Sequence, residues 1–458
     1  MLVVLGAALS LAALTVAILM AVFGMRIEMT GSGLRPIVSF DDSAEHYAAL
    51  EENRSQHYSR LLPAAPVTAA DAKPYWTDFR GPNRDGRYTQ SPIRTDWPID
   101  GLTPVWRQPI GGGYASFTVA NGRAFTIEQR RDQEVVTSYD LATGRELWSH
   151  SWDAHFKEVL GGPGPRATPT WFEGHVYALG ATGFFWSLDA QTGEVVWQRN
   201  ILEDSQATNL EWAMASSPLL EGDLVVVQPG GEDGWSVVAY DRHTGDVVWH
   251  ALDDVQSYTS PMSVTLAGQR QVLAVTAERV VGLAVDDGRL LWEHPWSPST
   301  VPNIAQPIVV DDDRVFLSAS YGYGATVIKL VPRDGQILVE TVWSNNRMKN
   351  RFGSSVLHEG YIYGLDESIL ACIDAATGEL QWKGGRYGYG QLLLAGDHLV
   401  VLTEDGDLAL VRATPDRHEE IGNSMALDGK TWNVPALAEG RLLVRNAREM
   451  AAFDLAPE

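Results

Sequence analysis

A short pattern recurs along this chain and constrains its fold more than any other feature. It places an aspartate, a Thr-Gly pair and a tryptophan at fixed offsets. Four copies keep these offsets, and two further copies, which end at Trp292 and Trp343, have diverged from them. The chain is therefore built from repeats. The four regular copies are Asp140–Trp148, Asp189–Trp197, Asp241–Trp249 and Asp374–Trp382.

Each copy predicts a β-hairpin in which one strand ends at the aspartate and the next strand carries the tryptophan. Glycine supplies the positive φ that the turn needs, and the aspartate side chain accepts hydrogen bonds from the turn. A single hairpin cannot bury a tryptophan, so each ring is expected to dock on a neighbouring repeat. The docking candidates are Trp106, Trp148, Trp197, Trp249, Trp292, Trp343 and Trp382.

The spacing of the turns predicts a propeller, because a repeat of about 44 residues suits a four-stranded blade. The last repeat has three strands of its own, and Pro104–Arg107 is expected to supply the fourth and close the ring. We therefore predict an all-β fold, an eight-bladed β-propeller of four-stranded antiparallel blades. The expected inner strands are Phe117–Ala120, Pro169–Phe172, Pro218–Glu221, Pro261–Thr265, Pro307–Val310, Ser354–His358, Leu392–Ala395 and Pro435–Ala438.

The repeat resembles that of the quinoprotein-type propellers. This superfamily includes the pyrroloquinoline-quinone (PQQ) alcohol dehydrogenases and the lipoprotein propeller of the outer-membrane β-barrel assembly machine. The segment Trp76–Gly86 is also similar to the lead-in of a bacterial PQQ-like repeat family without assigned activity. The resemblance covers Trp76 to Leu455 and is specific for the fold. For function it is weak, because this fold hosts both enzymes and scaffolds.

The first residues predict a membrane segment. Leu2–Phe23 contains no charged residue and is long enough to span a bilayer. We favour an uncleaved anchor over a signal peptide, since no basic residue precedes the segment and no convincing cleavage site follows it. Arg26 and Arg35 would by their charge place the propeller in the cytoplasm. The resemblance implies the exported side instead, so the expected location is the bacterial inner membrane with the propeller in the periplasm.

Three parts are expected along the chain. Residues 1–25 form the transmembrane anchor or signal segment, residues 26–75 a juxtamembrane linker, and residues 76–458 the propeller. Within the linker, Asp41–Leu62 has apolar residues at helical spacing and predicts a short helix. The stretch Ala64–Pro74 predicts a flexible connection after it.

Composition excludes some classes of partner. The chain has 35 basic and 58 acidic residues, a net charge of −23, which argues against a nucleic-acid partner. Cys372 is the single cysteine, so no intramolecular disulfide can form and no N-terminal cysteine can carry a lipid. Few cysteines are compatible with an exported protein.

Signals for catalysis are weak. The eleven histidines are scattered, and neither a metal-binding nor a nucleophile motif is present. The acidic runs Asp311–Asp313 and Glu404–Asp407 fall between strands, where turn chemistry explains them. No catalytic or metal-ligating residue is assigned.

The resemblance raises the question of a PQQ cofactor. Dehydrogenases of this superfamily hold the quinone between a tryptophan and a disulfide of adjacent cysteines, bind calcium through acidic and asparagine side chains, and use an aspartate base. This chain cannot form the cysteine pair, and no calcium-binding set can be assigned. We expect no cofactor. A PQQ-dependent alcohol dehydrogenase, with PQQ and calcium, is kept as the alternative function.

A binding site is predicted at one mouth of the central channel. The segments that lead into the inner strands place eight equivalent positions around this mouth, and five of them are aromatic. The alternative is that the aromatic residues plug the channel and the basic residues only line its rim. We predict a binding or assembly module that takes a protein, a peptide or a small anionic ligand, with Arg166 as the main anchor. The candidates are Tyr114, Arg166, Asn209, Tyr258, Asn303, Lys349, Phe352, Arg386, Tyr389, Lys430 and Trp432.

Overall fold

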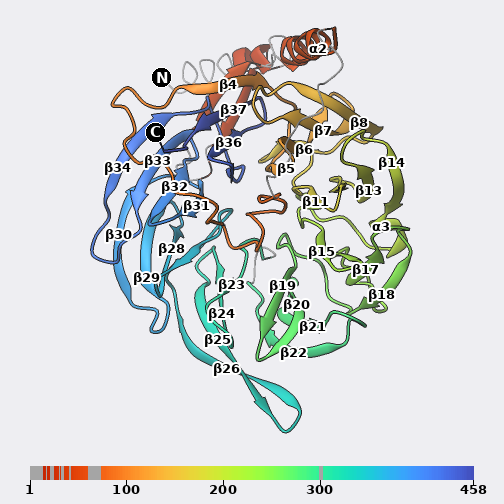
Figure 1. Cartoon of the computed structure of the whole chain (residues 1–458), viewed down its shortest axis with the longest axis vertical. Coiled ribbons are helices and arrows are strands. Elements are labelled where there is room, and N and C mark those ends of the chain that lie inside the picture. The colour runs from red at the N-terminus through yellow and green to blue at the C-terminus, as the bar shows by residue number, and fades with distance from the viewer. Residues whose placement is uncertain are drawn as a thin grey trace, which may run out of the picture.

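The computed structural model describes residues 14–16, 18–20, 25–29, 31, 36–40, 43–59, 74–298 and 303–457. Eight antiparallel blades form a closed ring around a central channel (Figure 1). Each expected inner strand overlaps an observed one, so the eight-bladed propeller with four-stranded blades is confirmed.

The first four blades run in chain order from the inner to the outer strand. Blade 1 contains β5 (Thr118–Ala120), β6 (Arg123–Arg130), β7 (Gln133–Asp140) and β8 (Glu146–Asp153). Blade 2 contains β11 (Thr170–Phe172), β12 (His175–Leu179), β13 (Phe184–Asp189) and β14 (Val195–Asn200). Blade 3 contains β15 (Leu219–Glu221), β16 (Leu224–Val227), β17 (Val237–Asp241) and β18 (Val247–Ala251). Blade 4 contains β19 (Met262–Leu266), β20 (Gln269–Val275), β21 (Arg279–Ala284) and β22 (Leu290–Pro295).

The last four blades continue this order until the ring closes. Blade 5 contains β23 (Ile308–Val309), β24 (Arg314–Ala319), β25 (Gly324–Arg333) and β26 (Gln336–Asn345). Blade 6 contains β27 (Val356–His358), β28 (Tyr361–Asp366), β29 (Ile369–Asp374) and β30 (Leu380–Arg386). Blade 7 contains β31 (Gln391–Ala395), β32 (His398–Leu402), β33 (Asp407–Arg412) and β34 (Glu420–Met425), with β3 (Arg87–Tyr88) parallel to β31. Blade 8 contains β35 (Ala436–Ala438), β36 (Arg441–Arg445), β37 (Glu449–Asp454) and β4 (Pro104–Pro109).

Smaller elements complete the described chain. They are the strand pair β1 (Met25–Met29) and β2 (Pro36–Phe40), the pair β9 (Lys157–Glu158) and β10 (Gly162–Pro163), and the helices α2 (Ser43–Ser59) and α3 (Ile201–Asp204). The pair of β1 and β2 was not predicted.

The ring closes as the sequence predicts. Strand β4 precedes blade 1 in the chain but pairs with β37 as the outer strand of blade 8, with Trp106 opposite Ala452. The last blade therefore contains strands from both ends of the propeller, and opening it would expose two strand edges.

Successive blades are held together by the repeated tryptophans. The indole N–H of Trp148 donates to the carbonyl of Ala190 on the next blade at 3.1 Å, and that of Trp197 donates to the backbone carbonyl of Arg242 at 2.8 Å. Trp292 differs, because its indole bonds Gln271 of its own blade at 2.5 Å. Similar bonds to the next blade are made by Trp106 to Leu141, Trp249 to Val285, Trp343 to Ala375 and Trp382 to Thr414.

The turn glycines serve this packing as well as the turn. A Cβ atom on Gly245 would lie 2.9 Å from the Cδ2 atom of Trp197, and one on Gly193 would lie 2.6 Å from Cε3 of Trp148. The indole ring of one blade therefore lies against the Thr-Gly turn of the next.

This contact can be measured with two glycine variants. Gly245 and Gly222 both have positive φ, at 74° and 59°, but a Cβ on Gly222 meets no atom within 4 Å. We expect Gly222→Ala to lower the free energy of unfolding by about 1 kcal/mol through backbone strain. Gly245→Ala should cost about 1 kcal/mol or more beyond that, because the added methyl overpacks Trp197. If urea denaturation gives equal losses of unfolding free energy for the two variants, the indole ring of Trp197 moves aside freely.

The lead-in Trp76–Tyr88 plugs one end of the central channel, crossing the centre of the ring in Figure 1. The Arg84 guanidinium donates to the carbonyls of Ser217 (3.0 Å), Pro261 (2.7 Å) and Pro218, on blades 3 and 4. It also forms an ion pair of 2.7 Å with Asp78. The segment that resembled a family lead-in is thus a buried plug.

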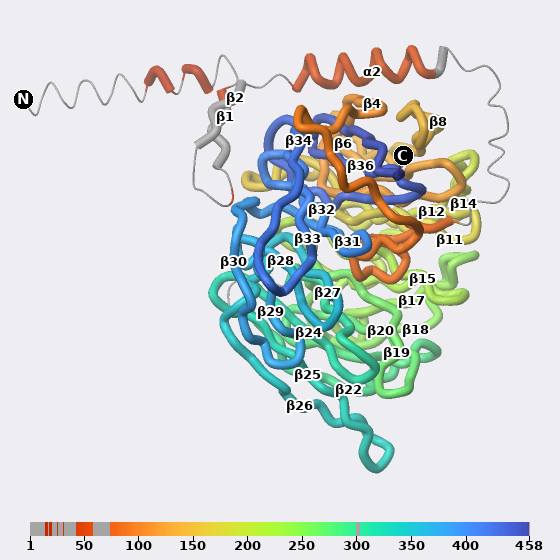
Figure 2. Tube along the Cα trace, turned by 60° about the vertical axis from the view of Figure 1, so that its left-hand side comes forward, coloured from red at the N-terminus to blue at the C-terminus, as the bar shows by residue number. Residues whose placement is uncertain are grey.

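Helix α2 confirms the helix expected within Asp41–Leu62. It lies along the outer strands β4 and β8, across the seam between blades 8 and 1 (Figures 1 and 2). Leu50 and Arg54 are buried in this contact, with 1% and 4% of their surface exposed. The helix is therefore docked on the propeller and is not only a spacer. The expected connection Ala64–Pro74 lies almost wholly outside the described residues.

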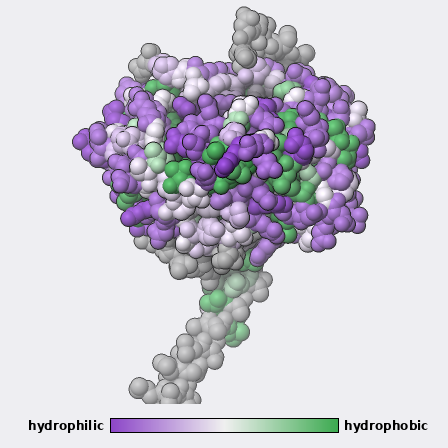
Figure 3. All heavy atoms as spheres, turned by 90° about the horizontal axis from the view of Figure 1, so that it is seen from below, coloured by the Kyte–Doolittle hydropathy of each residue, from purple (hydrophilic) through white to green (hydrophobic). Residues whose placement is uncertain are grey.

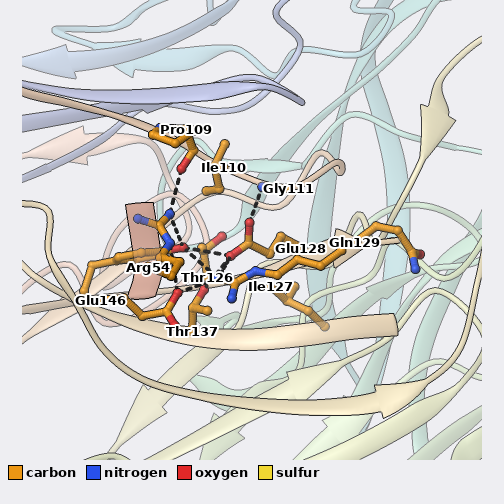
Figure 4. A network of polar contacts seen from close by, with 12 residues as sticks. Arg54, Pro109, Ile110, Gly111, Thr126, Ile127, Glu128, Gln129, Thr137 and Glu146 are labelled. Atoms are coloured by element: carbon orange, nitrogen blue, oxygen red, sulfur yellow. Dashed lines mark hydrogen bonds and ion pairs between the residues drawn. The ribbon is translucent and has the colours of Figure 1, made fainter. Parts of the chain in front are cut away.

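A buried ionic network fastens α2 to the seam (Figure 4). Arg54 donates to the carbonyl of Pro109 at 2.6 Å and lies 3.1 Å from the Glu146 carboxylate. Arg130 bridges Glu146 and Glu128, at 2.5 Å and 2.6 Å. The network joins α2, blade 1 and the closing strand β4.

The expected anchor Leu2–Phe23 falls mostly outside the described residues, which here are only 14–16 and 18–20. Among the helices that the structure describes, none combines the length and apolar character needed to cross a bilayer. The anchor therefore stays a prediction.

Candidate functional site

Four of the predicted mouth residues form one aromatic cluster. Tyr114 stacks on Trp432, with ring centroids 5.6 Å apart and an interplanar angle of 28°. Phe352 packs against Trp432 at 4.5 Å and meets Tyr389 edge-on at 5.5 Å. These residues come from blades 1, 6, 7 and 8, so the cluster spans the seam of the ring. We call Tyr114, Phe352, Tyr389 and Trp432 the mouth cluster.

Cations cover the mouth cluster. The Arg351 guanidinium lies 4.5 Å from the ring centroids of both Tyr321 and Tyr389, and it donates to the Tyr389 hydroxyl at 2.7 Å. The Lys430 ammonium lies 4.6 Å from the Trp432 ring. Burial raises the pKa of Tyr389, so its phenol stays neutral and accepts this bond near neutral pH. Cation–π contacts of this kind fix the rings in place.

A buried carboxylate lies beside the cluster. Glu404 is 3% exposed and accepts the indole N–H of Trp432 at 3.1 Å and the backbone N–H of Tyr389 at 3.3 Å. It also accepts the backbone N–H of Gly31, from the segment between β1 and β2, at 2.9 Å. The sequence suggested only a turn role for Glu404. No local signal marks it, because its partners lie far away in the chain.

A belt of polar residues forms the wall beneath the mouth. At five of the eight repeat positions, the residue two places after the mouth position has a polar side chain that accepts a backbone N–H from the preceding blade. Ser116 N–H donates to Thr168 at 2.9 Å, Thr168 to Ser217 at 2.9 Å, Ser217 to Ser260 at 2.8 Å, Ser260 to Gln306 at 2.7 Å and Gln306 to Ser354 at 3.0 Å. The mouth positions are thus held by a rigid hydrogen-bonded frame.

Arg166 has local partners that the sequence did not reveal. Its guanidinium donates to the carbonyls of Gly162 (3.1 Å) and Gly164, and lies 3.3 Å from the Glu158 carboxylate. Burial lowers its pKa, although Tyr114 and Glu158 oppose that shift. The side chain is 9% exposed and orders its own loop. A ligand role for Arg166 stays a prediction.

The remaining candidates lie away from the mouth cluster or have structural partners. Tyr258 packs on Trp212 at 5.7 Å, and burial raises the pKa of its phenol to about 12. Asn303 is 2% exposed and donates to two backbone carbonyls. Asn209 donates to the Ala181 carbonyl, Lys349 pairs with Asp366 at 2.7 Å, and Arg386 donates to Ser368.

The residues present do not fit the PQQ and calcium arrangement of the dehydrogenases. Cys372 is fully buried in β29, so it cannot supply a wall of a quinone site at the mouth. Glu404, the buried acid of the mouth, accepts N–H donors. Within the described part of the chain, no three His, Cys, Asp or Glu residues are grouped as metal ligands.

The rim opposite the seam differs from the mouth. Strands β25 and β26 project beyond the ring there (Figure 1). Figure 3 shows that this side is mostly hydrophilic, with separate hydrophobic patches. Leu338 and Val342 of β26 are 40% and 42% exposed. Scattered apolar residues of this kind are normal on a protein surface.

A comparison with models of protein families matches this chain to one family. A family model described as outer membrane protein assembly factor BamB matches residues 103–215, 131–384 and 321–417. The chain is 23% identical over 394 residues to assembly factor BamB of Burkholderia pseudomallei (strain K96243), covering 75% of this chain and 96% of that protein. It is also 23% identical to BamB of Bordetella pertussis (strain Tohama I) over 370 residues, 72% of this chain and 92% of that protein.

Solved structures share the fold. The crystal structure of BamB from Moraxella catarrhalis superposes with a TM-score of 0.58 at 16% identity, covering 77% of this chain and all of that one. A europium-containing methanol dehydrogenase gives 0.59 at 11% identity, covering 83% and 91%. At such low identity these likenesses show the fold alone, and assembly factors and dehydrogenases both share it.

Proposed function

Since this chain belongs to the PQQ-like propeller family described as outer membrane protein assembly factor BamB, we propose that it acts as a protein-binding assembly module. The mouth cluster is its binding surface. The N-terminal segment anchors the propeller on the exported face of the bacterial inner membrane. This location is supported by the apolar run Leu2–Phe23, which is long enough to span a bilayer.

One observation carries the proposal: aromatic side chains from four blades converge at one end of a channel whose other end is plugged. Aromatic residues and arginine are enriched at the centres of protein interfaces, where they contribute most of the binding energy. The polar belt and the cations hold these rings in one arrangement, so little conformational entropy is lost when a partner binds. Because the other end of the channel is plugged, the mouth is better suited to bind a partner than to let a molecule pass through.

Photo-crosslinking tests this function. A benzoylphenylalanine in place of Phe352 should crosslink to a defined protein partner in the native membrane, and Trp432→Ala should abolish that adduct. The same probe in place of Leu338, on the projecting hairpin, is the matched control. A partner captured at position 338 and not at 352 would move the binding surface to the rim.

The dehydrogenase alternative has its own test. Adding PQQ and calcium to the purified protein should leave its melting temperature unchanged, because a ligand stabilises only a folded state that binds it. A saturable rise of several degrees, together with alcohol-dependent dye reduction, would replace the assembly function with the enzyme.

A further inference from the structure

The mouth cluster has an occupant within the same chain. Strands β1 and β2 pair antiparallel, with Met29 opposite Pro36, and Gly31 lies in the segment that joins them. The backbone N–H of Gly31 donates to the Glu404 carboxylate at 2.9 Å. Gly31 therefore reaches the buried Glu404 carboxylate beside the mouth cluster.

Only glycine fits at this position. A Cβ atom on residue 31 would lie 2.5 Å from Cδ2 of Tyr389, 2.8 Å from Oε1 of Glu404 and 3.0 Å from Cζ2 of Trp432. Separations this short are not tolerated unless the neighbours move. The close approach of these three side chains is what excludes a larger residue at this position.

The surrounding side chains cannot easily move away. Tyr389 is 8% exposed, its hydroxyl is held by Arg351 at 2.7 Å, and Phe352 packs against its ring. Trp432 is held between Tyr114 and Phe352, and its indole N–H donates to Glu404. The three residues that face Gly31 form a fixed cage with room for a backbone and no side chain.

We expect the contact of Gly31 with the cage to be reversible, because one backbone hydrogen bond is the interaction that the structure shows for it. A two-stranded hairpin is marginally stable by itself. Helix α2, docked through Arg54, tethers the hairpin beside the mouth, and a short tether gives an effective concentration on the order of millimolar. Gly31 then occupies the cage because it is held nearby and not because its contact is large. A protein partner with a larger interface can therefore displace Gly31.

We propose that the cage of Tyr389, Glu404 and Trp432 is a glycine-backbone site, and that Gly31 fills it at rest until a glycine-containing segment of a protein partner takes its place. This inference rests on the proposed function, because it assigns the regulation and the recognised chemistry of the same mouth. The partner's segment must present a backbone N–H to Glu404 and a glycine to the two rings.

A peptide of residues 25–40 tests the cage directly. The full chain carrying Gly31→Val should lose its resting occupant and bind the fluorescently labelled wild-type peptide at least tenfold more tightly than the unaltered chain. The same peptide with Gly31→Val should not bind. Adding Trp432→Ala to the Gly31→Val chain should remove peptide binding, while its circular dichroism spectrum stays that of a folded propeller. Equal peptide binding by the unaltered and Gly31→Val chains would overturn occupancy by Gly31, and binding of the valine peptide would overturn the glycine requirement.

Crosslinking from position 352 separates this inference from the proposed function. Gly31→Val should increase the partner adduct severalfold if both hold. An adduct of equal strength with and without Gly31→Val would leave the assembly function standing and overturn the resting occupant. Peptide binding that follows the glycine pattern, without any partner adduct, would overturn the assembly function and leave the cage standing.

Discussion

Replacing Arg84 with methionine is expected to lower the free energy of unfolding by roughly 3–5 kcal/mol, the loss typical when one partner of a buried ion pair is removed. Arg84 is 2% exposed and is the central side chain of the plug. Methionine fills a similar volume but donates no hydrogen bond. The Asp78 carboxylate would keep its charge without its guanidinium, and the carbonyls of Ser217 and Pro261 would lose a donor.

The matched control is Arg87→Met, three residues further along the same segment. Arg87 is exposed, and its side chain makes no contact of this kind among the described residues. This control should change stability by less than about 0.5 kcal/mol. Urea denaturation followed by tryptophan fluorescence measures both variants. Similar losses of unfolding free energy for the two variants would mean that the buried contacts of Arg84 contribute little to the stability of the propeller.

The periodic part of this structure could be predicted from sequence and the rest could not. The Thr-Gly turns and the tryptophans that pack on them repeat along the chain, so blade number, inner strands and closure by β4 follow from spacing. Arg84 and Arg54 belong to segments that occur once. Most of their partners are groups that lie far away in the chain, such as the carbonyls of Pro261 and Pro109, and these leave no trace in the local sequence.

In the candidate site too, the repeated features could be predicted from the sequence and the others could not. The aromatic residues of the mouth cluster were found because they occupy equivalent positions in the repeat. Arg166 stands out at such a position as a charge among uncharged residues, yet its loop supplies Glu158 as a partner. Glu404 looked like a turn residue, because the N–H donors that give it a role come from residues 31, 389 and 432. Equivalent positions in the repeat therefore identify the aromatic residues of the mouth, whereas the partners of Arg166 and Glu404 do not follow the repeat.

Two glutamates of blade 1 should respond to pH in opposite ways. Burial would raise the pKa of Glu128, but the guanidinium groups of Arg130, Arg54 and Arg445 outweigh it and hold this pKa at about 2. Burial raises the pKa of Glu134 to about 7, against a hydrogen bond of 2.8 Å from the Ala181 N–H. Both groups have an ordinary value of 4.5 when unfolded.

Glu128 is a stronger acid in the folded state, so its stabilisation is present above about pH 4.5 and is lost as the pH falls towards 2. Glu134 is a weaker acid in the folded state, so its favourable contribution is present below about pH 4.5 and is lost as the pH rises through 7. Each shift corresponds to roughly 3 kcal/mol.

Glutamine variants should therefore separate the two. Glu128→Gln should lower the free energy of unfolding by roughly 3 kcal/mol at pH 7, with a smaller loss below pH 4, because it removes the charge that pairs with three arginines. Glu134→Gln keeps an acceptor for the Ala181 N–H and avoids a buried negative charge. It should match the unaltered protein at pH 4 and exceed its stability at pH 8, where the unaltered protein must ionise Glu134 or bind a proton. Denaturation at a series of pH values gives both profiles. A Glu134→Gln variant that is less stable than the unaltered protein at pH 8 would mean that Arg166 stabilises an ionised Glu134, and Glu128 and Glu134 would then both be charged at that pH.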